Sequence, residues 1–160
     1  MIKFLGILLL STSISIYGTF LSRKTKYIQE IRDDIYHLLK AIERDIKYGC
    51  IPLSRIIFSF KPKTQCVSDF IKEISQGKNV FDVTDENLSL LDVSEREKIK
   101  VFFSATGKST CSEKELILCK NCLDFFEDNN AKTKKDTDTT AVLYRKLGYL
   151  CSILTFIILI

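Results

Sequence analysis

The sequence predicts an all-α protein, an antiparallel helical bundle flanked by amino-terminal and carboxyl-terminal transmembrane helices. Both ends of the 160-residue chain are nearly free of charge, and the middle shows apolar residues at helical spacing. Two prolines and six glycines are too few for a β-sandwich, which needs a turn signal every ~8–12 residues. With 46% hydrophobic and 28% charged residues, the composition also excludes a disordered or collagen-like chain.

Residues 1–21 are predicted to form the first transmembrane helix. No charged residue lies between Phe4 and Leu21, and a helix of that length rises about 27 Å, close to the ~30 Å hydrocarbon core of a bilayer. A cleaved signal peptide is the alternative interpretation. Its apolar region usually has only ~7–15 residues and ends at a small-residue cleavage site, which this sequence lacks.

Residues 147–160 are predicted to form the second membrane segment. This segment rises only about 21 Å, so Arg145 and Lys146 would have to snorkel to the head groups or the bilayer would have to thin. The same two basic residues abut the apolar tail, which disfavours a signal for a glycosylphosphatidylinositol anchor.

The basic residues near the two segments predict the topology. One basic residue, Lys3, precedes the first segment and four follow it, whereas five precede the second segment and none follows it. By the positive-inside rule, residues 22–146 form a cytoplasmic domain of a multi-pass protein of the cell membrane. Basic flanks of this kind also attract anionic head groups, although topology alone explains them. The flanks considered for head-group contact are Arg23, Lys24, Lys26, Lys132, Lys134 and Lys135. The topology count also includes Arg32, Arg145 and Lys146.

Apolar residues trace a series of amphipathic helices in the middle of the chain. Residues 27–48 carry seven apolar residues at steps of one, three or four, which is typical of one helical face, and Gly49 supplies a stop signal. Two short helices are expected within residues 53–60 and 67–74, the second ending at Gly77. The seven residues of the first face are Ile28, Ile31, Ile35, Leu38, Leu39, Ile42 and Ile46.

Two capping patterns predict the later helices. The pattern at residues 94–97, Ser-Glu-Arg-Glu, opens a helix that ends at Gly107, and the pattern at residues 110–113 opens another that continues to Phe126. Residues 79–93 fit no single element. Residues 127–140 are almost all polar and form either a solvated helix or a linker, since Asn, Asp and Thr are weak helix formers.

Two motifs contain part of a phosphate-binding or thiol site without completing it. Gly107-Lys108-Ser109 has the end of a phosphate-binding loop, but the first glycine of that loop is replaced by Phe102 and no strand precedes it. Residues 119–122 form a C-x-x-C sequence without the second ligand pair of a structural zinc site. Cys119 is more simply a small buried hydrophobe, and the thiols of a cytoplasmic domain are expected to be free.

No catalytic, cofactor-binding or metal site is predicted. Asp34 and His37 have the spacing of a carboxylate-histidine pair of a di-iron bundle, but the sequence lacks the partner motif that such a site needs. One histidine on a charged helix face does not assemble a nucleophilic or acid–base site. The sequence therefore predicts a protein that is not an enzyme and has no small-molecule substrate, and its net charge of +4 does not indicate nucleic acid.

Two blocks of sequence resemble the stage III sporulation protein AB family of endospore-forming Firmicutes. The first is residues 43–53, ERDIKYGCIPL, and the second is residues 144–150, YRKLGYL, which leads into the terminal apolar segment. The resemblance covers essentially the full length and rests on structural motifs rather than catalytic ones. Residues 105–115 depart from the family pattern, with Thr106-Gly107-Lys108-Ser109-Thr110 in place of its usual turn.

The resemblance implies a non-enzymatic scaffold in the membrane complex that joins mother cell and forespore during sporulation. The family is similar to the helical cytoplasmic domains of type II secretion and type IV pilus platform proteins, which lie beside a cytoplasmic ATPase. The implied partners are the lipid membrane, a secretion-type ATPase and other stage III sporulation membrane proteins.

An acidic stretch is the expected partner face of the cytoplasmic domain. Charged runs are usually solvated surfaces, which is the simpler interpretation of this one. The alternative functions are a secreted or tail-anchored small disulfide-bearing protein and a nucleotide-dependent enzyme built on Gly107-Lys108-Ser109. The residues of the expected face are Asp82, Asp85, Glu86, Asp92, Glu95 and Glu97.

Overall fold

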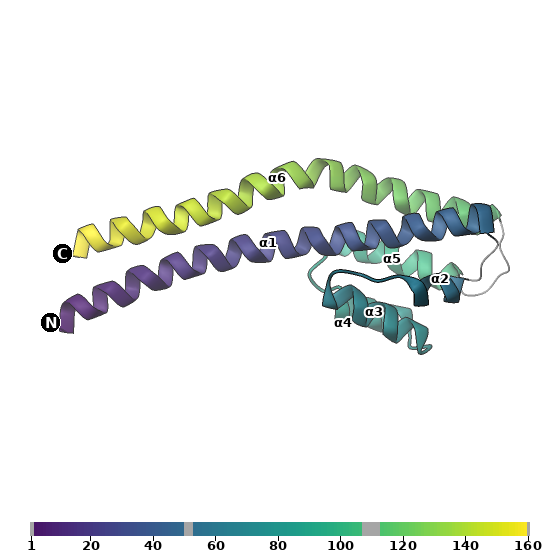
Figure 1. Ribbon diagram of the computed structural model, residues 1–160, viewed down its shortest axis with the longest axis horizontal. Helices are drawn as coiled ribbons and strands as arrows, with labels where there is room; N and C mark the ends of the chain where they lie inside the picture. Colours follow the sequence, from purple (N-terminus) through teal and green to yellow (C-terminus); the bar gives the residue numbers. More distant parts are fainter. Residues whose placement is uncertain (1, 50–52, 107–112, 160) are drawn as a thin grey trace. The chain divides into compact units, whose positions relative to one another are not determined.

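A computed structural model describes residues 2–49, 53–106 and 113–159 of the chain (Figure 1). Within these residues the protein is all-α, as predicted, with six helices. They are α1 (Ile2–Gly49), α2 (Leu53–Ser59), α3 (Gln65–Ser75), α4 (Val80–Asn87), α5 (Val93–Thr106) and α6 (Glu113–Leu159).

The chain divides into two compact units. One is Glu30–Ala131, and the other combines Met1–Gln29 with Lys132–Ile160. The long helices α1 and α6 therefore each contribute to both units. We call the first unit the helical domain and the second the hairpin, and each is described by itself. The boundaries expected at residues 21 and 146 concern the edge of a membrane and stay a prediction.

The apolar face predicted for residues 27–48 forms the centre of the helical domain. Its five central residues are completely buried, and only the end residues Ile28 and Ile46 are partly exposed. Phenylalanines of α3 and α5 pack edge to face beside them, with ring centroids 5.4 Å apart for Phe70 and Phe103. The five buried residues of α1 are Ile31, Ile35, Leu38, Leu39 and Ile42.

Helix α3 ends as the sequence predicts, at Gly77. This glycine has a φ of 79°, a conformation that costs a residue with a Cβ more than it costs glycine. The Gly77 N–H donates to the Ile74 carbonyl at 2.9 Å and the Lys78 N–H donates to the Glu73 carbonyl at 3.3 Å. The two bonds form a Schellman motif that satisfies the last carbonyls of α3.

Of two stretches for which the sequence predicts no single structure, one is partly helical and the other is helical throughout. In residues 79–93, the Asn79 side chain accepts the Phe81 N–H at 3.1 Å and starts α4, and Leu88 and Leu91 after it are buried. Residues 127–140 are a continuous part of α6. Elements on both sides are helical, so the chain continues the helix despite the weak intrinsic preference of these residues.

The capping box predicted at Ser94 and Glu97 is wrong, because α5 begins two residues earlier. The Glu95 carboxylate accepts the Asp92 N–H at 3.0 Å, and the Asp92 carbonyl accepts the first helical hydrogen bond from Arg96 N–H at 3.0 Å. Asp92 is therefore the N-cap and Glu95 occupies the third helical position. The predicted stop at Gly107 lies outside the described residues. So does the other predicted box, at residues 110–113, except for its last residue, Glu113.

Two polar side chains of α1 hold the starts of α3 and α5. Arg32 donates from Nε to Glu95 Oε1 at 2.7 Å and from a terminal nitrogen to Asp92 at 3.2 Å. Asp34 Oδ2 accepts the Lys63 N–H, the Thr64 N–H and the Thr64 hydroxyl at 2.9, 2.7 and 2.7 Å. Each of these contacts places a carboxylate at the positive end of a helix, where its charge is stabilising.

The Arg32–Glu95 pair predicts a distinctive pattern of stability in variants. Arg32→Met leaves Glu95, which is 1% exposed, without its cation and should lower the free energy of unfolding by about 3–5 kcal/mol. The double variant with Glu95→Gln should regain most of this loss, because the neutral amide still accepts the Asp92 N–H. Thermal unfolding of the full chain in detergent, followed by circular dichroism, measures both effects.

Arg55→Met is the matched control for this prediction. Arg55 is exposed on α2, so its replacement should change the unfolding temperature little. A double variant as unstable as Arg32→Met alone would contradict the assignment of the cost to an unpaired buried charge.

Candidate membrane hairpin and partner surface

The hairpin is built around a close contact between two glycines. A Cβ added to Gly18 on α1 would lie 2.8 Å from the Gly148 Cα atom on α6 and 2.9 Å from the Tyr144 carbonyl oxygen. Both distances are shorter than real Cβ contacts allow, so only glycine permits the helices to approach this closely. Figure 1 shows the first part of α1 and the last part of α6 running side by side.

Small residues line the buried side of this contact. On α1, Ser11 and Ser22 are buried seven residues before and four residues after Gly18, and on α6 Ala141 is completely buried seven residues before Gly148. Small residues at such spacing are typical of helix pairs in membranes, where backbones pack closely. Sequence reasoning missed this feature, although the spacing of Ser11, Gly18 and Ser22 within the apolar run was visible.

Large apolar side chains of the hairpin lie on its outside. Ile16 is 68% exposed and Ile158 is 71% exposed, and the same holds along both helices. Such a surface is unfavourable in water and favourable against lipid tails. The other exposed apolar residues of the hairpin include Leu8, Leu9, Leu10, Tyr17, Phe20, Leu147, Leu150, Ile153, Leu154 and Ile157.

Among the residues that the structure describes, α6 is the one helix long and apolar enough to cross a membrane. It meets this criterion within Glu115–Ile158, where the most apolar window of 18 residues has a mean hydropathy of 1.5. Only 11% of that window is buried, which sets it apart from a core helix of a soluble protein. The expected amino-terminal span and the multi-pass topology stay predictions.

The predicted acidic face lies on α4 and the start of α5, with one exception. Asp82, Asp85, Glu86 and Glu97 are exposed, and so is Asp92, whose side chain is 75% exposed. Glu95 is buried in the ion pair with Arg32. The prediction that Glu95 belongs to an exposed face is therefore wrong. The remaining five carboxylates are called the acidic surface below.

Cations lie beneath the acidic surface, and one of them, Arg32, comes from a distant part of the sequence. Asp85 accepts from Arg96 and from Lys100, both at 2.8 Å, and Lys100 also lies 3.3 Å from Glu97. The hydrogen bond from Lys100 lowers the pKa of Asp85, and Asp85 in turn raises the pKa of Lys100. The side chains of Arg32 and Lys100 are only 11% and 9% exposed, so the carboxylates cover them.

Asp82 and Glu86 differ from the other members of the acidic surface. Both are exposed on α4 one helical turn apart, and neither forms an ion pair within the described residues. Phe81 and Val93, which are 48% and 66% exposed, adjoin Asp82 and Asp92 in the sequence. The surface thus combines free carboxylates with apolar side chains, as protein interfaces commonly do.

The other candidate motifs do not come together as sites. Asp34 is buried against Thr64, whereas His37 lies exposed against the edge of Tyr36, so the two do not form a carboxylate-histidine pair. Phe102 is packed in the core within α5, and residues 107–109 of the possible phosphate loop lie outside the described residues. Across residues 2–49, 53–106 and 113–159, no three His, Cys, Asp or Glu side chains gather as metal ligands would.

The two thiols of the C-x-x-C sequence are separate and buried. The Cys119 thiol donates to the Leu39 carbonyl at 3.6 Å and the Cys122 thiol to the Lys98 carbonyl at 3.9 Å. Burial raises the pKa of each thiol to about 12. As predicted, Cys119 is a small buried residue, and the four cysteines that the structure describes are thiols rather than disulfides.

These thiols should resist alkylation in the folded chain. With a pKa of about 12, only about one molecule in ten thousand carries the reactive thiolate at pH 8. Iodoacetamide applied to the full chain in detergent should modify partly exposed Cys66 and spare Cys119 and Cys122 until denaturant is added. Peptide mass spectrometry reads each position, and a disulfide at Cys119 or Cys122 would favour the secreted alternative.

A comparison with models of protein families assigns the chain to a family. The family model described as stage III sporulation protein AB (spore_III_AB) matches residues 3–160. No curated protein and no solved structure matches the chain. The match covers both long helices and everything between them, and its description names a stage of sporulation and no reaction. The chain belongs to the stage III sporulation protein AB family.

Proposed function

We propose that this protein is a non-enzymatic membrane scaffold that docks a cytoplasmic secretion-type ATPase in the sporulation complex between mother cell and forespore. The observation that carries the proposal is the inverted packing of the hairpin, with small residues inside and large apolar residues outside. That packing suits lipid on all sides. The helical domain then remains outside the bilayer as a docking module.

The proposed topology is a membrane hairpin with a cytoplasmic domain. Two antiparallel helices whose free ends lie side by side (Figure 1) suit two crossings of one bilayer. The excess of basic residues on the inner side of both segments supports a cytoplasmic position of the helical domain. A cytoplasmic domain is within reach of an ATPase, which is the partner that the family resemblance implies.

The acidic surface is the proposed contact for the ATPase. Asp82 and Glu86 supply exposed negative charge without an ion pair among the described residues, and Phe81, which precedes Asp82 on α4, supplies exposed apolar area. Charged groups accelerate encounter and select the partner, while apolar area stabilises the complex. The complementary surface on the ATPase is expected to be basic.

The hairpin predicts a position-specific effect of one substitution. Gly18→Leu forces a side chain into the 2.8 Å approach to Gly148 and should separate the helices, lowering the unfolding temperature of the full chain in detergent by several degrees. Gly6→Leu is the matched control, because a Cβ at Gly6 meets nothing within 4 Å. Equal effects of the two variants would contradict the glycine contact.

Charge reversal on the acidic surface tests the docking proposal. Asp82→Lys combined with Glu86→Lys should weaken capture of the ATPase by the full chain in detergent about tenfold or more at low salt, with a smaller difference at high salt. Asp124→Lys combined with Asp128→Lys is the control, because it reverses two exposed carboxylates at the same helical spacing on α6. If the wild-type chain fails to capture the ATPase at every salt concentration tested, direct docking is refuted.

An equal loss in the control and the test variant would refute the acidic surface while leaving docking in place. Both variants keep Asp85 and Asp92, so the ion pairs with Lys100 and Arg32 that order the surface are retained.

A further inference from the structure

We propose that the hairpin carries a cationic collar that binds the head groups of anionic phospholipids. The inference rests on the proposed insertion of the hairpin into a membrane. The collar consists of Arg23, Lys24, Lys26, Arg145 and Lys146, all of which are exposed.

The glycine contact fixes the position of these residues along the hairpin. Because Gly18 lies against Gly148 and the helices are antiparallel, distances along both can be counted from this contact at about 1.5 Å per residue. Lys146 and Arg145 then lie about 3 and 4.5 Å from it, and Arg23, Lys24 and Lys26 lie about 7.5 to 12 Å from it in the same direction. Five cations from two ends of the sequence thus occupy a band about 9 Å deep.

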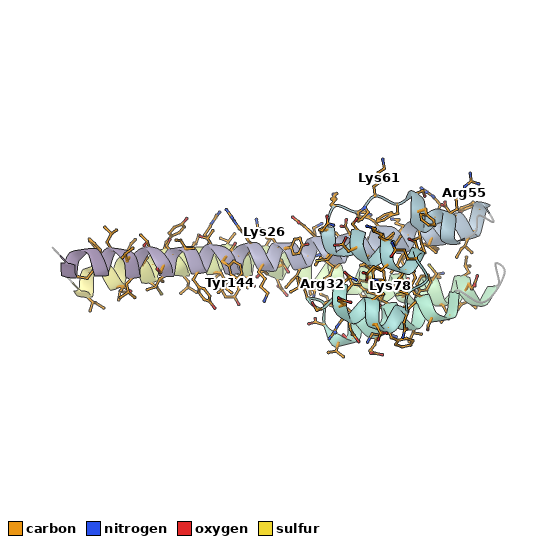
Figure 2. All side chains as sticks on the ribbon, turned by 90° about the horizontal axis from the view of Figure 1, so that it is seen from below. Lys26, Arg32, Arg55, Lys61, Lys78 and Tyr144 are labelled. Carbon is orange, nitrogen blue, oxygen red and sulfur yellow. The ribbon has the colours of Figure 1, made fainter. Side chains whose placement is uncertain are left out.

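The band contains no acidic residue to neutralise these cations. Residues 19–27 of α1 and 139–147 of α6 contain neither Asp nor Glu. Within the described part of the chain, the ion pairs of Arg32, Arg44, Lys78, Arg96 and Lys100 all lie in the helical domain, so none of them involves the collar. Figure 2 shows Lys26 and Tyr144 extending from the two helices along the same stretch of the hairpin.

The first charged residues of the two helices place this band at the level of the head groups. No charged residue lies between Phe4 and Leu21 or between Leu147 and Ile160, whereas Arg23 and Lys146 lie next to these runs, on the same side of the glycine contact. Because charged side chains are costly in the hydrocarbon core, the bilayer surface lies just beyond the glycine contact. Exposed Tyr17, Phe20, Tyr144 and Tyr149 are found at the same level, where aromatic side chains favour the interface.

Topology alone requires basic residues near the segments but does not require them to be gathered in one band. A cation near an anionic surface strengthens binding about fivefold, so five of them at head-group depth act together on one or a few lipids. Lys132 and Lys135 are also exposed on α6, but they lie about 20–24 Å from the glycine contact. These two lysines are therefore too distant to join the collar.

Native mass spectrometry of the full chain tests the collar. The chain in a neutral detergent is titrated with phosphatidylglycerol and, separately, with zwitterionic phosphatidylcholine, and lipid-bound species are counted. The wild type should bind phosphatidylglycerol in clear preference, and Lys24→Gln with Lys26→Gln should weaken that binding about 25-fold. The matched control, Lys132→Gln with Lys135→Gln, removes the same charge and should weaken binding by less than about threefold.

Two outcomes would overturn the collar: equal binding of both lipids by the wild type, or an equal loss in the control variant. Alkaline carbonate extraction from vesicles of phosphatidylglycerol and phosphatidylcholine separates this failure from that of the proposed function. A chain that resists extraction but shows no lipid preference refutes only the collar. A chain released by carbonate is not inserted, which refutes the membrane hairpin and the collar with it.

Discussion

The ion pair between Arg32 and Glu95 is the contact on which the geometry of the acidic surface depends. A buried carboxylate is tolerated only when a cation and hydrogen-bond donors replace its lost water, and Glu95 has both in Arg32 and the Asp92 N–H. Because Arg32 belongs to α1, the pair fixes the start of α5 against the central helix of the domain. Two residues later, Asp34 does the same for α3, so α4 is held from both sides.

The chain satisfies opposite packing rules in its two units. In the helical domain the large apolar side chains are inside, where burial from water stabilises them. In the hairpin they are outside, and the contact between helices is made by glycine, serine and alanine. The same two helices, α1 and α6, follow both rules along their length. This change of rule is the strongest structural indication that the protein is divided between lipid and water.

Periodicity in the sequence was enough to predict the central helix and its buried face, because spacing of three and four reports burial directly. Local patterns were weaker guides to helix starts. The stretch Asp92–Glu97 contains two overlapping capping patterns, and the choice between them is made by Arg32, which lies sixty residues away in the sequence. The buried position of Glu95 follows from the same distant contact.

The pairing of Arg32 and Lys100 with the acidic surface could not be predicted from the sequence, because it too depends on the fold. Within the acidic stretch Arg96 is the only basic residue, so the sequence shows an almost uniformly negative run. The fold brings Arg32 from α1 and Lys100 from the next turns of α5 under the carboxylates. Pairing of this kind depends on tertiary structure, whereas the apolar run that forms the hairpin is a property of composition alone and was visible at once.

The pairing divides the acidic surface into two kinds of carboxylate, with different consequences for the proposed docking. Asp85, Asp92 and Glu97 are held by cations within 3.3 Å, so they lose little conformational entropy when a partner binds and mainly define shape. Asp82 and Glu86 are not held in this way, and their charge extends into solvent, where it steers a basic partner from a distance. A surface of this design attracts its partner through two residues and positions it through three others. Its encounter rate therefore depends on salt more strongly than the lifetime of the complex does.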